Sequence, residues 1–487
     1  MTIAPASPAA GLPAAGSPAG DLPGALRAAH PDVETRRARC DAAVRVASSG
    51  LLAAGLLLVT FWWASGGGLG QLGGWQTGLL SLGRVTALWA ALLLLVQVLL
   101  MARVPVLEAA YGQDTLARHH RVVGFTSFTL LMAHIGLITW GYAAGRLAAT
   151  PGTLWDLTVD YPGVLLAVAG TACLVLVVAT SIRAARSRLR YESWHLLHLY
   201  AYLGVGLALP HQLWTGTEFL ASPARTAFWW MLWAAAVGSV LAWRVGVPLG
   251  RSLRHRLRVT SVVPEADGVV SVYVTGRRLD RLRVEAGQFL SWRFLDRAGW
   301  TRAQPYSLSA APDGRSLRIT VQDVGDGSGS VAGLRPGTRV LVEGPYGRLS
   351  ARARTRRGVA LIGAGVGITP LRALAEALAY SPGDAVLIQR HTRAPLFAGE
   401  LEVLSRERGL RVLHLPGHRR HPGSWLGVGL GPAELVSDVT ALRRWVPDIA
   451  ERDVFVCGPE AWVESVRRSA EAAGVPPAQF HVETFRW

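Results

Sequence analysis

The chain has 487 residues, half of them hydrophobic, and so has room for two to four domains. Its formal charge of +17 comes from arginine alone, because the sequence contains no lysine. An arginine-only excess reflects coding bias better than selection for phosphate contacts, and we expect no nucleic-acid partner. The three cysteines, Cys40, Cys173 and Cys457, have no ligand spacing, which excludes a disulfide framework, an iron–sulfur centre and a thiolate zinc site.

Residues 1–44 are predicted to be a disordered cytoplasmic tail, because Ala, Pro and Gly dominate its first part and bury little. It has no charged segment followed by an apolar one, so no cleaved signal peptide is expected. Six apolar segments follow within residues 45–250, each long enough to cross a bilayer as a helix of about 20 residues. Their limits are 46–65, 84–103, 121–143, 159–182, 191–214 and 225–247.

Runs of arginine at the ends of these segments predict their direction. The runs are Arg36, Arg37, Arg39 and Arg45 before the first segment, Arg183, Arg186, Arg188 and Arg190 after the fourth, and Arg251, Arg254, Arg256 and Arg258 after the sixth. If both termini are cytoplasmic, all three runs are cytoplasmic too, as the positive-inside rule requires. The connections 66–83, 144–158 and 215–224 then face outward. We therefore expect a multi-pass protein of the plasma membrane, surrounded by the lipid bilayer.

The third and fifth segments carry histidines at matching heights. His120 and His134 are about 21 Å apart along a helix axis, and His198 and His211 about 20 Å, at about 1.5 Å rise per residue. Both segments run from inside to outside, so His120 is level with His198, and His134 with His211. Two pairs of imidazoles predict two stacked b-type haems, each iron held by one histidine from each helix. Polar groups inside a membrane are functional candidates by default.

The directions of these side chains leave an alternative open. His120 and His134 are fourteen residues apart, so on a regular helix their side chains point within about 40° of each other. His198 and His211 are thirteen residues apart, so their side chains point about 140° apart. A kink at Pro210, directly before His211, is one way to realign it. The alternative is that the histidines only hydrogen-bond to neighbours in a membrane core. His119 and His195 are interpreted as surface or supporting groups outside the ligand set.

After Arg258 the pattern changes to short strands separated by Gly and Pro turns. The strand candidates read LRVTSVV, VVSVYVTG, FLSWRFL, SLRITVQDV and TRVLVEGPYG. They predict a small antiparallel β-barrel over residues 253–352. An α/β domain over residues 355–487 is expected to follow, because a buried strand leads through GAGVGITP into a helical pattern from Pro370.

The glycine-rich turn of this domain is predicted to bind a nucleotide. Gly363, Gly365 and Gly367 let the backbone approach a pyrophosphate, and the helix start at Thr369 and Pro370 offers free N–H groups. The alternative is a tight turn that serves packing alone.

Coenzyme choice is predicted from the end of the next strand, AVLIQR. Arg390 and Arg393 stand where an NAD-selective fold often has an acid for the ribose hydroxyl. Arginine suits a 2′-phosphate, which favours NADPH and leaves NADH possible. The alternative is a pair of solvated surface arginines.

In order along the chain, these features resemble the ferric reductase and NADPH oxidase family. In that family a six-span dihaem domain precedes a module similar to ferredoxin–NADP reductase, and the resemblance covers nearly everything beyond residue 45. The motifs that carry it are QPYSLS at 304–309, GDGSGSVAGL at 325–334, GAGVGITP at 363–370, VFVCGP at 454–459 and the terminal ETFRW. They resemble, respectively, the flavin motif, the FAD-phosphate segment, the nicotinamide-dinucleotide loop, its second signature and the family's aromatic ending.

The resemblance implies roles for individual residues. Tyr306 would stack on the isoalloxazine, Ser307 would bond to it, Cys457 would lie beside the nicotinamide and Trp487 would cover the flavin. The further cofactor contacts that it implies are Gln304, Pro305, Gly327, Ser328, Gly458 and Pro459. The family usually has Arg or His where this chain has Gln304, which carries no charge to offset FAD phosphate. Tyr306 as a core aromatic and Cys457 as a small buried hydrophobe are the alternatives.

The sequence therefore predicts a multidomain membrane protein: an all-α six-helix haem bundle, an antiparallel β-barrel for FAD and an α/β nucleotide-binding domain. The resemblance implies electron transfer from cytoplasmic NADPH through FAD and two haems to an extracytoplasmic small molecule or metal chelate, such as oxygen or a ferric chelate. No obligate protein partner is expected. A membrane-anchored flavoreductase serving a cytoplasmic partner would leave the four histidines unexplained, and a haem sensor would leave the soluble motifs unexplained.

Overall fold

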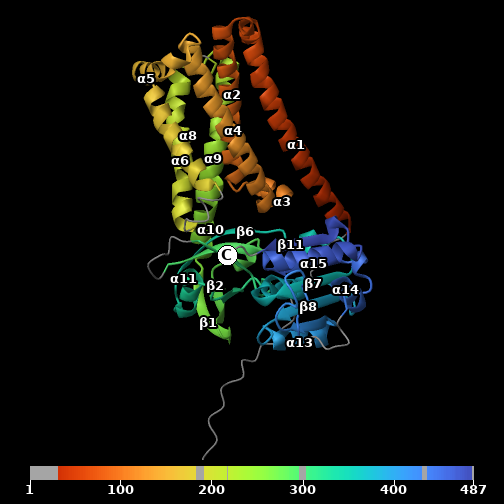
Figure 1. Cartoon of the computed structure of the whole chain (residues 1–487). Helices are drawn as coiled ribbons and strands as arrows, with labels where there is room; N and C mark the ends of the chain where they lie inside the picture. Colours follow the sequence, from red (N-terminus) through yellow and green to blue (C-terminus); the bar gives the residue numbers. More distant parts are fainter. Residues whose placement is uncertain (1–30, 183–190, 217, 296–302, 430–435, 485–487) are drawn as a thin grey trace, which may run out of the picture.

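The computed structural model describes residues 31–182, 191–216, 218–295, 303–429 and 436–484. Long helices form a bundle at one end of the molecule, and three β-sheets with their helices form the other end (Figure 1). The short helix α5 (Thr150–Asp160) lies at the end of the bundle that is remote from the sheets (Figure 1). The two halves predicted from the hydropathy pattern are therefore two separate parts of the fold.

Five helical stretches in the described part of the chain are long and apolar enough to cross a membrane. They are Arg39–Gly68, Trp75–Met101, Thr115–Tyr142, Val164–Ser181 and Pro223–His255. The helix α8 (Tyr191–Trp214) has a comparable length and lies beside α6 in the bundle (Figure 1). Its three histidines and Pro210 make it less apolar than the others. A helical membrane-type first half is confirmed, and the count of six spans stays a prediction.

The helices of this half are α1 (Pro31–Trp63), α2 (Trp75–Met101), α3 (Pro105–Tyr111), α4 (Gln113–Tyr142), α5, α6 (Val164–Ser181), α8, α9 (Pro223–Ser239) and α10 (Val247–His255). The start of α1 lies inside the predicted disordered tail, so residues 31–44 are helical. Pro31 suits a first helical position, and the Ala and Arg residues after it are good helix formers. The segment 240–246 is a wider helical turn that prolongs α9, whereas α1 is followed by a kink at Gly66 and Gly67, whose backbone angles are not helical. The arginine run at 183–190 lies outside the described residues.

Small residues bring α6 and α8 into close contact. A Cβ atom on Gly170 would lie 2.6 Å from the carbonyl oxygen of Gly204, and one on Gly204 would lie 2.8 Å from that of Gly170. No side chain larger than hydrogen fits at these separations, because backbone atoms cannot move aside. Close backbone approach through glycine is a common basis of helix association in membranes. It fixes the position of α8, which carries two of the predicted haem ligands.

The first β region consists of two three-stranded antiparallel sheets, in the orders β1-β2-β5 and β4-β3-β6. Its strands are β1 (Arg258–Ala266), β2 (Val269–Thr275), β3 (Phe289–Phe294), β4 (Gln304–Ser307), β5 (Ser316–Gln322) and β6 (Val340–Tyr346). Alternate residues of β6 are buried, as expected for a sheet with one face on a core. Single bridges join the sheets at Arg258 with Arg339 and at Leu308 with Ile319. The closed barrel therefore stays a prediction.

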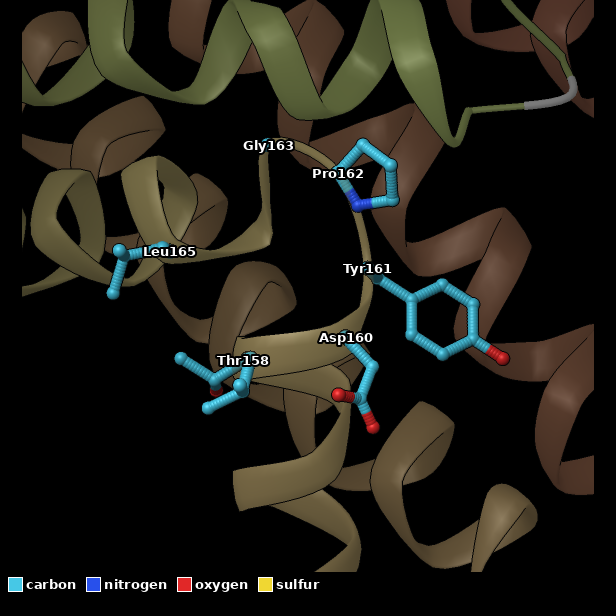
Figure 2. A pocket seen from close by; sticks show the side chains of 7 residues that line it. Thr158, Asp160, Tyr161, Pro162, Gly163 and Leu165 are labelled. Carbon is cyan, nitrogen blue, oxygen red and sulfur yellow. The ribbon is translucent and has the colours of Figure 1, made fainter.

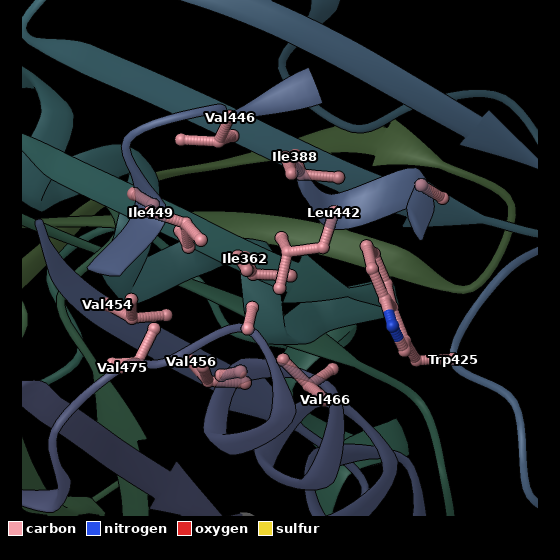
Figure 3. Close-up of a cluster of buried hydrophobic side chains, with 14 of the residues drawn as sticks. Ile362, Ile388, Trp425, Leu442, Val446, Ile449, Val454, Val456, Val466 and Val475 are labelled. Carbon is pink, nitrogen blue, oxygen red and sulfur yellow. The ribbon is translucent and has the colours of Figure 1, made fainter. Parts of the chain in front are cut away.

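The second region is a five-stranded parallel sheet with the order β11-β10-β7-β8-β9. Its strands are β7 (Val359–Ala364), β8 (Ala385–His391), β9 (Arg411–Pro416), β10 (Asp453–Gly458) and β11 (Phe480–Thr484). Every residue of β7 and β10 is buried, as in a sheet covered by helices on both faces. The helices α14 (Asp438–Trp445) and α15 (Glu460–Ala472) cover one face, where Ile362, Val456 and Leu442 share a core (Figure 3). The other α-helices described in the reductase half are α11 (Asp326–Gly329), α12 (Ile368–Ala377) and α13 (Ala398–Arg408).

A buried ion-pair network joins the two regions. Arg318 of β5 donates to both carboxylate oxygens of Glu400 in α13, at 2.7 and 3.0 Å. Arg372 of α12 forms an ion pair with the same carboxylate at 2.6 Å and donates to Glu376 at 2.5 Å. Glu376 in turn accepts from the backbone N–H of Ala311 at 2.7 Å. Because the guanidinium groups of Arg318 and Arg372 are nearly buried, these contacts fix the orientation of the two regions.

Candidate functional site

The inner pair of histidines lies where α4 and α8 face each other. The ring centroids of His120 and His198 are 5.9 Å apart, with the ring planes at 63°. The Nδ1 atom of His120 is 3.2 Å from the carbonyl oxygen of Gln97, and that of His198 is 3.3 Å from the Oγ of Ser181. The predicted pairing of these two residues by height is therefore observed.

The outer pair is His134 and His211, which are close enough to interact electrostatically. The Nδ1 atom of His134 is 2.9 Å from the carbonyl oxygen of Gly83. The Nδ1 atom of His211 is 2.6 Å from the Oγ1 of Thr215. The helix α8 continues through Pro210.

All four rings use Nδ1 for a hydrogen bond with the protein, and none of their Nε2 atoms forms one within the described residues. A metal-bound histidine has this arrangement, with one ring nitrogen anchored and the other free for the metal. Metal–imidazole bonds of about 2 Å place two nitrogens on opposite sides of one ion about 4 Å apart, and the ring centroids about 6 Å apart. The separation in the inner pair agrees with this value. The inner pair therefore fits an iron that would be held by two imidazoles.

No group of three or more His, Cys, Asp or Glu residues in the described chain is arranged to hold a metal ion. A haem iron needs only two protein ligands, because the porphyrin supplies the other four. His119 is exposed and contacts the ring of Tyr111. His195 is exposed as well and interacts electrostatically with Arg293 and Glu343 of the β3–β6 sheet. Both positions agree with their predicted exclusion from the ligand set.

The predicted flavin residues lie on β4. The hydroxyl of Tyr306 donates to the Oε1 of Gln304, and its backbone carbonyl accepts from the indole of Trp292 at 3.1 Å. Burial raises the pKa of Tyr306. The Oγ of Ser307 is buried and has no hydrogen-bond partner among the described residues. Buried hydroxyls are usually paired, so Ser307 fits a ligand that is a hydrogen-bond partner beside Tyr306. Pro305 is exposed.

The predicted FAD-phosphate loop ends in the one-turn helix α11. The Oγ of Ser328 donates to the carbonyl oxygen of Gly325 at 3.0 Å and accepts from the N–H of Val324 at 2.8 Å. This hydroxyl therefore closes the loop, and Gly327 lies one residue before it in α11. Trp487 lies outside the described residues, so its predicted place over the flavin stays a prediction.

The glycine-rich loop packs against the carboxyl end of β10. Gly365 has a positive φ of 56°, and a Cβ atom on Gly367 would lie 2.3 Å from the carbonyl oxygen of Cys457. Glycine is therefore required at both positions. Gly363 is the register partner of Cys457. The helix α12 begins at Ile368, two residues before the predicted start, so Thr369 and Pro370 lie buried in its first turn.

Cys457 is fully buried, and its pKa is raised by burial and further by the charge of Glu483. Its burial agrees with either predicted interpretation, a thiol beside the nicotinamide or a small buried hydrophobe. The next two residues, Gly458 and Pro459, line a hollow of about 140 Å³ beside the glycine loop. Gln322 and Val324 close this hollow from the antiparallel region. The hollow therefore lies between the two regions of the reductase half.

The structure separates the two arginines that were predicted to select the coenzyme. Arg390 lines the hollow, and burial, followed by the nearby charge of Arg419, lowers its pKa. Arg393 is exposed, pairs with Asp267 at 3.0 Å and is not among the residues that line the hollow. His391 lines the hollow in its place. His391 directly follows Arg390 at the strand end and was not among the predicted site residues.

A second hollow lies at the remote end of the bundle, in the turn between α5 and α6. It has a volume of about 430 Å³ and is lined by residues 158–163 and Leu165 (Figure 2). Gly163 adopts a positive φ of 80°, and a Cβ atom there would lie 2.8 Å from the backbone nitrogen of His211. The hollow therefore borders the backbone of an outer histidine.

Known proteins resemble the two halves separately. The family model of the ferric reductase like transmembrane component matches residues 86–209, which include all four paired histidines. The ferredoxin reductase component of 3-ketosteroid-9-alpha-monooxygenase from Mycolicibacterium smegmatis is 32% identical over 255 residues, which cover 49% of this chain and 67% of that protein. An NADPH oxidoreductase of Mycobacterium tuberculosis is 26% identical over 250 residues, covering 49% of this chain and 62% of that protein.

Among solved structures, the FAD/NAD-binding domain of a nitric oxide dioxygenase from Vibrio cholerae is similar to this chain, with 25% sequence identity and a TM-score of 0.35. The match covers 48% of this chain and 99% of that domain's chain.

Proposed function

This chain belongs to the ferredoxin-reductase-type flavoprotein family, fused here to a ferric-reductase-like transmembrane component, and from that premise we propose that it is a transmembrane oxidoreductase. In this proposal, electrons pass from cytoplasmic NADPH through FAD and two b-type haems to an extracytoplasmic acceptor. Six helices would cross the plasma membrane, with both termini in the cytoplasm.

The observation that carries this proposal is the hydrogen bonding of the four histidines. Each Nδ1 is anchored to a protein oxygen, and each Nε2 is left free in the described structure. Histidines that only stabilised a membrane core would gain from bonding both nitrogens, because unpaired polar groups are costly there. The four free nitrogens in two pairs therefore favour iron ligation over a structural role.

The residues of the reductase half support binding and orientation of the other cofactors. When bound, FAD takes up two electrons as hydride and releases them singly, and each haem carries one electron. The free Oγ of Ser307 would hold the isoalloxazine against Tyr306. The backbone of Gly365 and Gly367 and the N-terminus of α12 would hold the coenzyme pyrophosphate. The hollow beside the glycine loop, which Arg390 and Gly458 also line, would then hold part of the coenzyme between the two regions.

The acceptor is proposed to be oxygen or a ferric chelate. The hollow between α5 and α6 would admit a small molecule close to the outer histidine pair, because Gly163 contacts the backbone of His211. It lies at the end of the bundle remote from the reductase half (Figure 1), as outward electron transfer requires.

Haem content tests the proposal most simply. The purified protein is expected to show the low-spin spectrum of bis-imidazole haem, with two haems per chain. His134→Ala or His211→Ala should remove one haem and leave the other, because the pairs are separate. His119→Ala, on the same helix as His134 but exposed, is the matched control and should keep both haems. Full haem content in all variants would contradict the assignment and favour a flavoreductase with a passive membrane anchor.

A further inference from the structure

The two paired histidines of α4 are held by the main chain of α2. The Nδ1 atom of His120 is 3.2 Å from the carbonyl oxygen of Gln97. The Nδ1 atom of His134 is 2.9 Å from the carbonyl oxygen of Gly83. A carbonyl oxygen only accepts, so both Nδ1 atoms donate and both Nε2 atoms keep a lone pair. No change of side chain on α2 removes these two acceptors.

The outer histidine of α8 is held by a side-chain hydroxyl instead. The Nδ1 atom of His211 is 2.6 Å from the Oγ1 of Thr215. The same Oγ1 donates to the carbonyl oxygen of His211 at 2.8 Å, which uses the one hydrogen of the hydroxyl. The Oγ1 therefore accepts from Nδ1, and the Nε2 of His211 also keeps its lone pair.

The inner histidine of α8 shares a hydroxyl with a tryptophan. The Nδ1 atom of His198 is 3.3 Å from the Oγ of Ser181, the last residue of α6. The indole of Trp194, one turn before His198, donates to the same oxygen at 3.3 Å. The ring of Trp194 also lies against that of His198, with centroids 4.9 Å apart and planes at 35°. Trp194 thus contacts both the imidazole and the oxygen that holds it.

The direction of the bond between Ser181 and His198 follows from ligation. A hydroxyl has one hydrogen and two lone pairs, and the indole of Trp194 occupies one of these lone pairs. A neutral imidazole that binds a metal through Nε2 carries its hydrogen on Nδ1. The second lone pair of Ser181 is then the acceptor for His198. Each histidine pair therefore combines one ring on a main-chain carbonyl with one ring on a hydroxyl.

We propose that Ser181 and Thr215 are positioning residues that set the reduction potentials of the inner and the outer haem independently, and that Trp194 holds Ser181 and His198 in place. This inference rests on the proposed ligation of haem by the four histidines. A hydrogen bond accepted from Nδ1 raises the basicity of the imidazole and so favours ferric over ferrous iron. On α8 this bond depends on a single side chain at each level of the bundle.

The direction and size of the effect follow from this role. Without the hydroxyl, the imidazole donates less charge to the iron, so the midpoint potential of that haem should rise. Loss of a group that supports a metal-binding histidine typically changes metal affinity about tenfold or more. A tenfold change in the preference for ferric over ferrous iron corresponds to about 59 mV for a one-electron couple.

Redox potentiometry of the detergent-solubilised full chain, followed by the haem absorption bands, tests the inference. The natural protein should show two one-electron steps. Ser181→Ala should raise the potential of one step by about 59 mV, and Thr215→Val should raise the other by a similar amount. His211→Ala, which is expected to keep the inner haem alone, identifies the step that belongs to Ser181.

Matched variants separate the hydrogen bond from packing. Thr180→Val removes the hydroxyl directly before Ser181, which donates to carbonyl oxygens of its own helix at 2.8 and 3.1 Å, and should leave both potentials unchanged. Ser181→Thr keeps a hydroxyl and should keep the natural potential. Trp194→Leu should alter the low-spin EPR signal of the inner haem, because that signal depends on the angle between the two axial imidazole planes.

Two results would overturn the inference alone: unchanged potentials in Ser181→Ala and Thr215→Val with both haems bound, or equal shifts of both steps in either variant. If Ser181→Ala loses a haem, retention of that haem in Ser181→Thr and Thr180→Val supports the inference, and its loss in those variants overturns it. A natural protein without haem would instead overturn the proposed function, and this inference with it.

Discussion

Replacing Glu400 by Gln should loosen the contact between the two regions of the reductase half. Glu400 accepts from Arg318 at 2.7 and 3.0 Å and forms an ion pair with Arg372 at 2.6 Å. The neutral amide removes the charge that balances two guanidinium groups which are only 6% and 8% exposed. Glutamine has nearly the same shape, so the change tests the charge rather than the packing.

The size of the effect follows from the burial of the partners. Removing one member of a buried ion pair costs about 3–5 kcal/mol. Glu400 itself is 34% exposed and Arg372 keeps its bond with Glu376, so the expected loss is smaller, about 2–3 kcal/mol. For a region of this size, that loss lowers a thermal midpoint by about 5–10 °C.

Release of flavin fluorescence on heating, followed in the solubilised full chain, measures this loss. Glu402→Gln is the matched control, because Glu402 lies on the same helix and its pair with Arg406 is long, at 4.0 Å, and about 70% exposed on both sides. An exposed pair contributes less than about 1 kcal/mol, so this control should shift the midpoint little. Equal midpoints for Glu400→Gln and Glu402→Gln would refute the reasoning.

Because of Glu400, the stability of the reductase half should also depend on pH, in a direction that the structure determines. Burial raises the pKa of Glu400, but the hydrogen bond from Arg318 and the charge of Arg372 outweigh it, so its pKa lies below the ordinary value of 4.5. A carboxyl group whose pKa is lowered by folding stabilises the fold at pH values above its ordinary pKa. This stabilisation is lost as the pH falls through the lowered pKa of the folded state. The difference in thermal midpoint between the natural protein and Glu400→Gln should therefore be largest at pH 7 and should shrink below about pH 4.5.

Three further predictions concern the cofactor sites. Ser307→Ala should slow flavin reduction by NADPH about fivefold to tenfold in stopped-flow measurements while haem content stays unchanged, since one hydrogen bond is lost; unchanged rates would contradict its proposed role. Gly204→Ala should lower haem content because its Cβ would meet the backbone of Gly170 at 2.8 Å, whereas Gly206→Ala, with nothing within 4 Å, should not; equal haem content in both would contradict the close contact. Deleting Trp487 should change the Michaelis constants for NADPH and NADH without changing haem content, and unaltered kinetics with both would mean that it is only a packed terminus.

Long-range pairing in the bundle was predictable from the sequence because helices impose a constant rise. The axial distance between two histidines on one helix can be compared with that on another helix. This comparison predicted that His120 lies beside His198, as observed. Direction around the helix axis was less predictable. The thirteen-residue spacing argued against His211, yet it lies near His134 in a helix that continues through Pro210.

Side-chain partners at the coenzyme site could not be predicted in this way. Arg390 and Arg393 looked equivalent in the sequence, since both follow the same strand. Arg393 pairs with Asp267, which comes from a hairpin of the other region, and the sequence does not reveal this contact.

The predictions for two helices were wrong because local composition suggested another structure. The Ala-rich start of the chain suggested disorder throughout residues 1–44, but the charged and helix-forming residues after Pro31 continue the first membrane helix. The helix α5 was missed because a short amphipathic stretch in an outer connection has too few residues to show a period.

Electron transfer across a sealed membrane tests the central claim most directly. NADPH would be enclosed in right-side-out vesicles, and reduction of an impermeant external acceptor would be followed with the natural protein and with a variant carrying both His134→Ala and His211→Ala. We expect reduction with enclosed NADPH, none with external NADPH, and none in the double variant. Reduction that persists in the double variant, or that requires NADPH outside, would contradict a path through the histidine pairs.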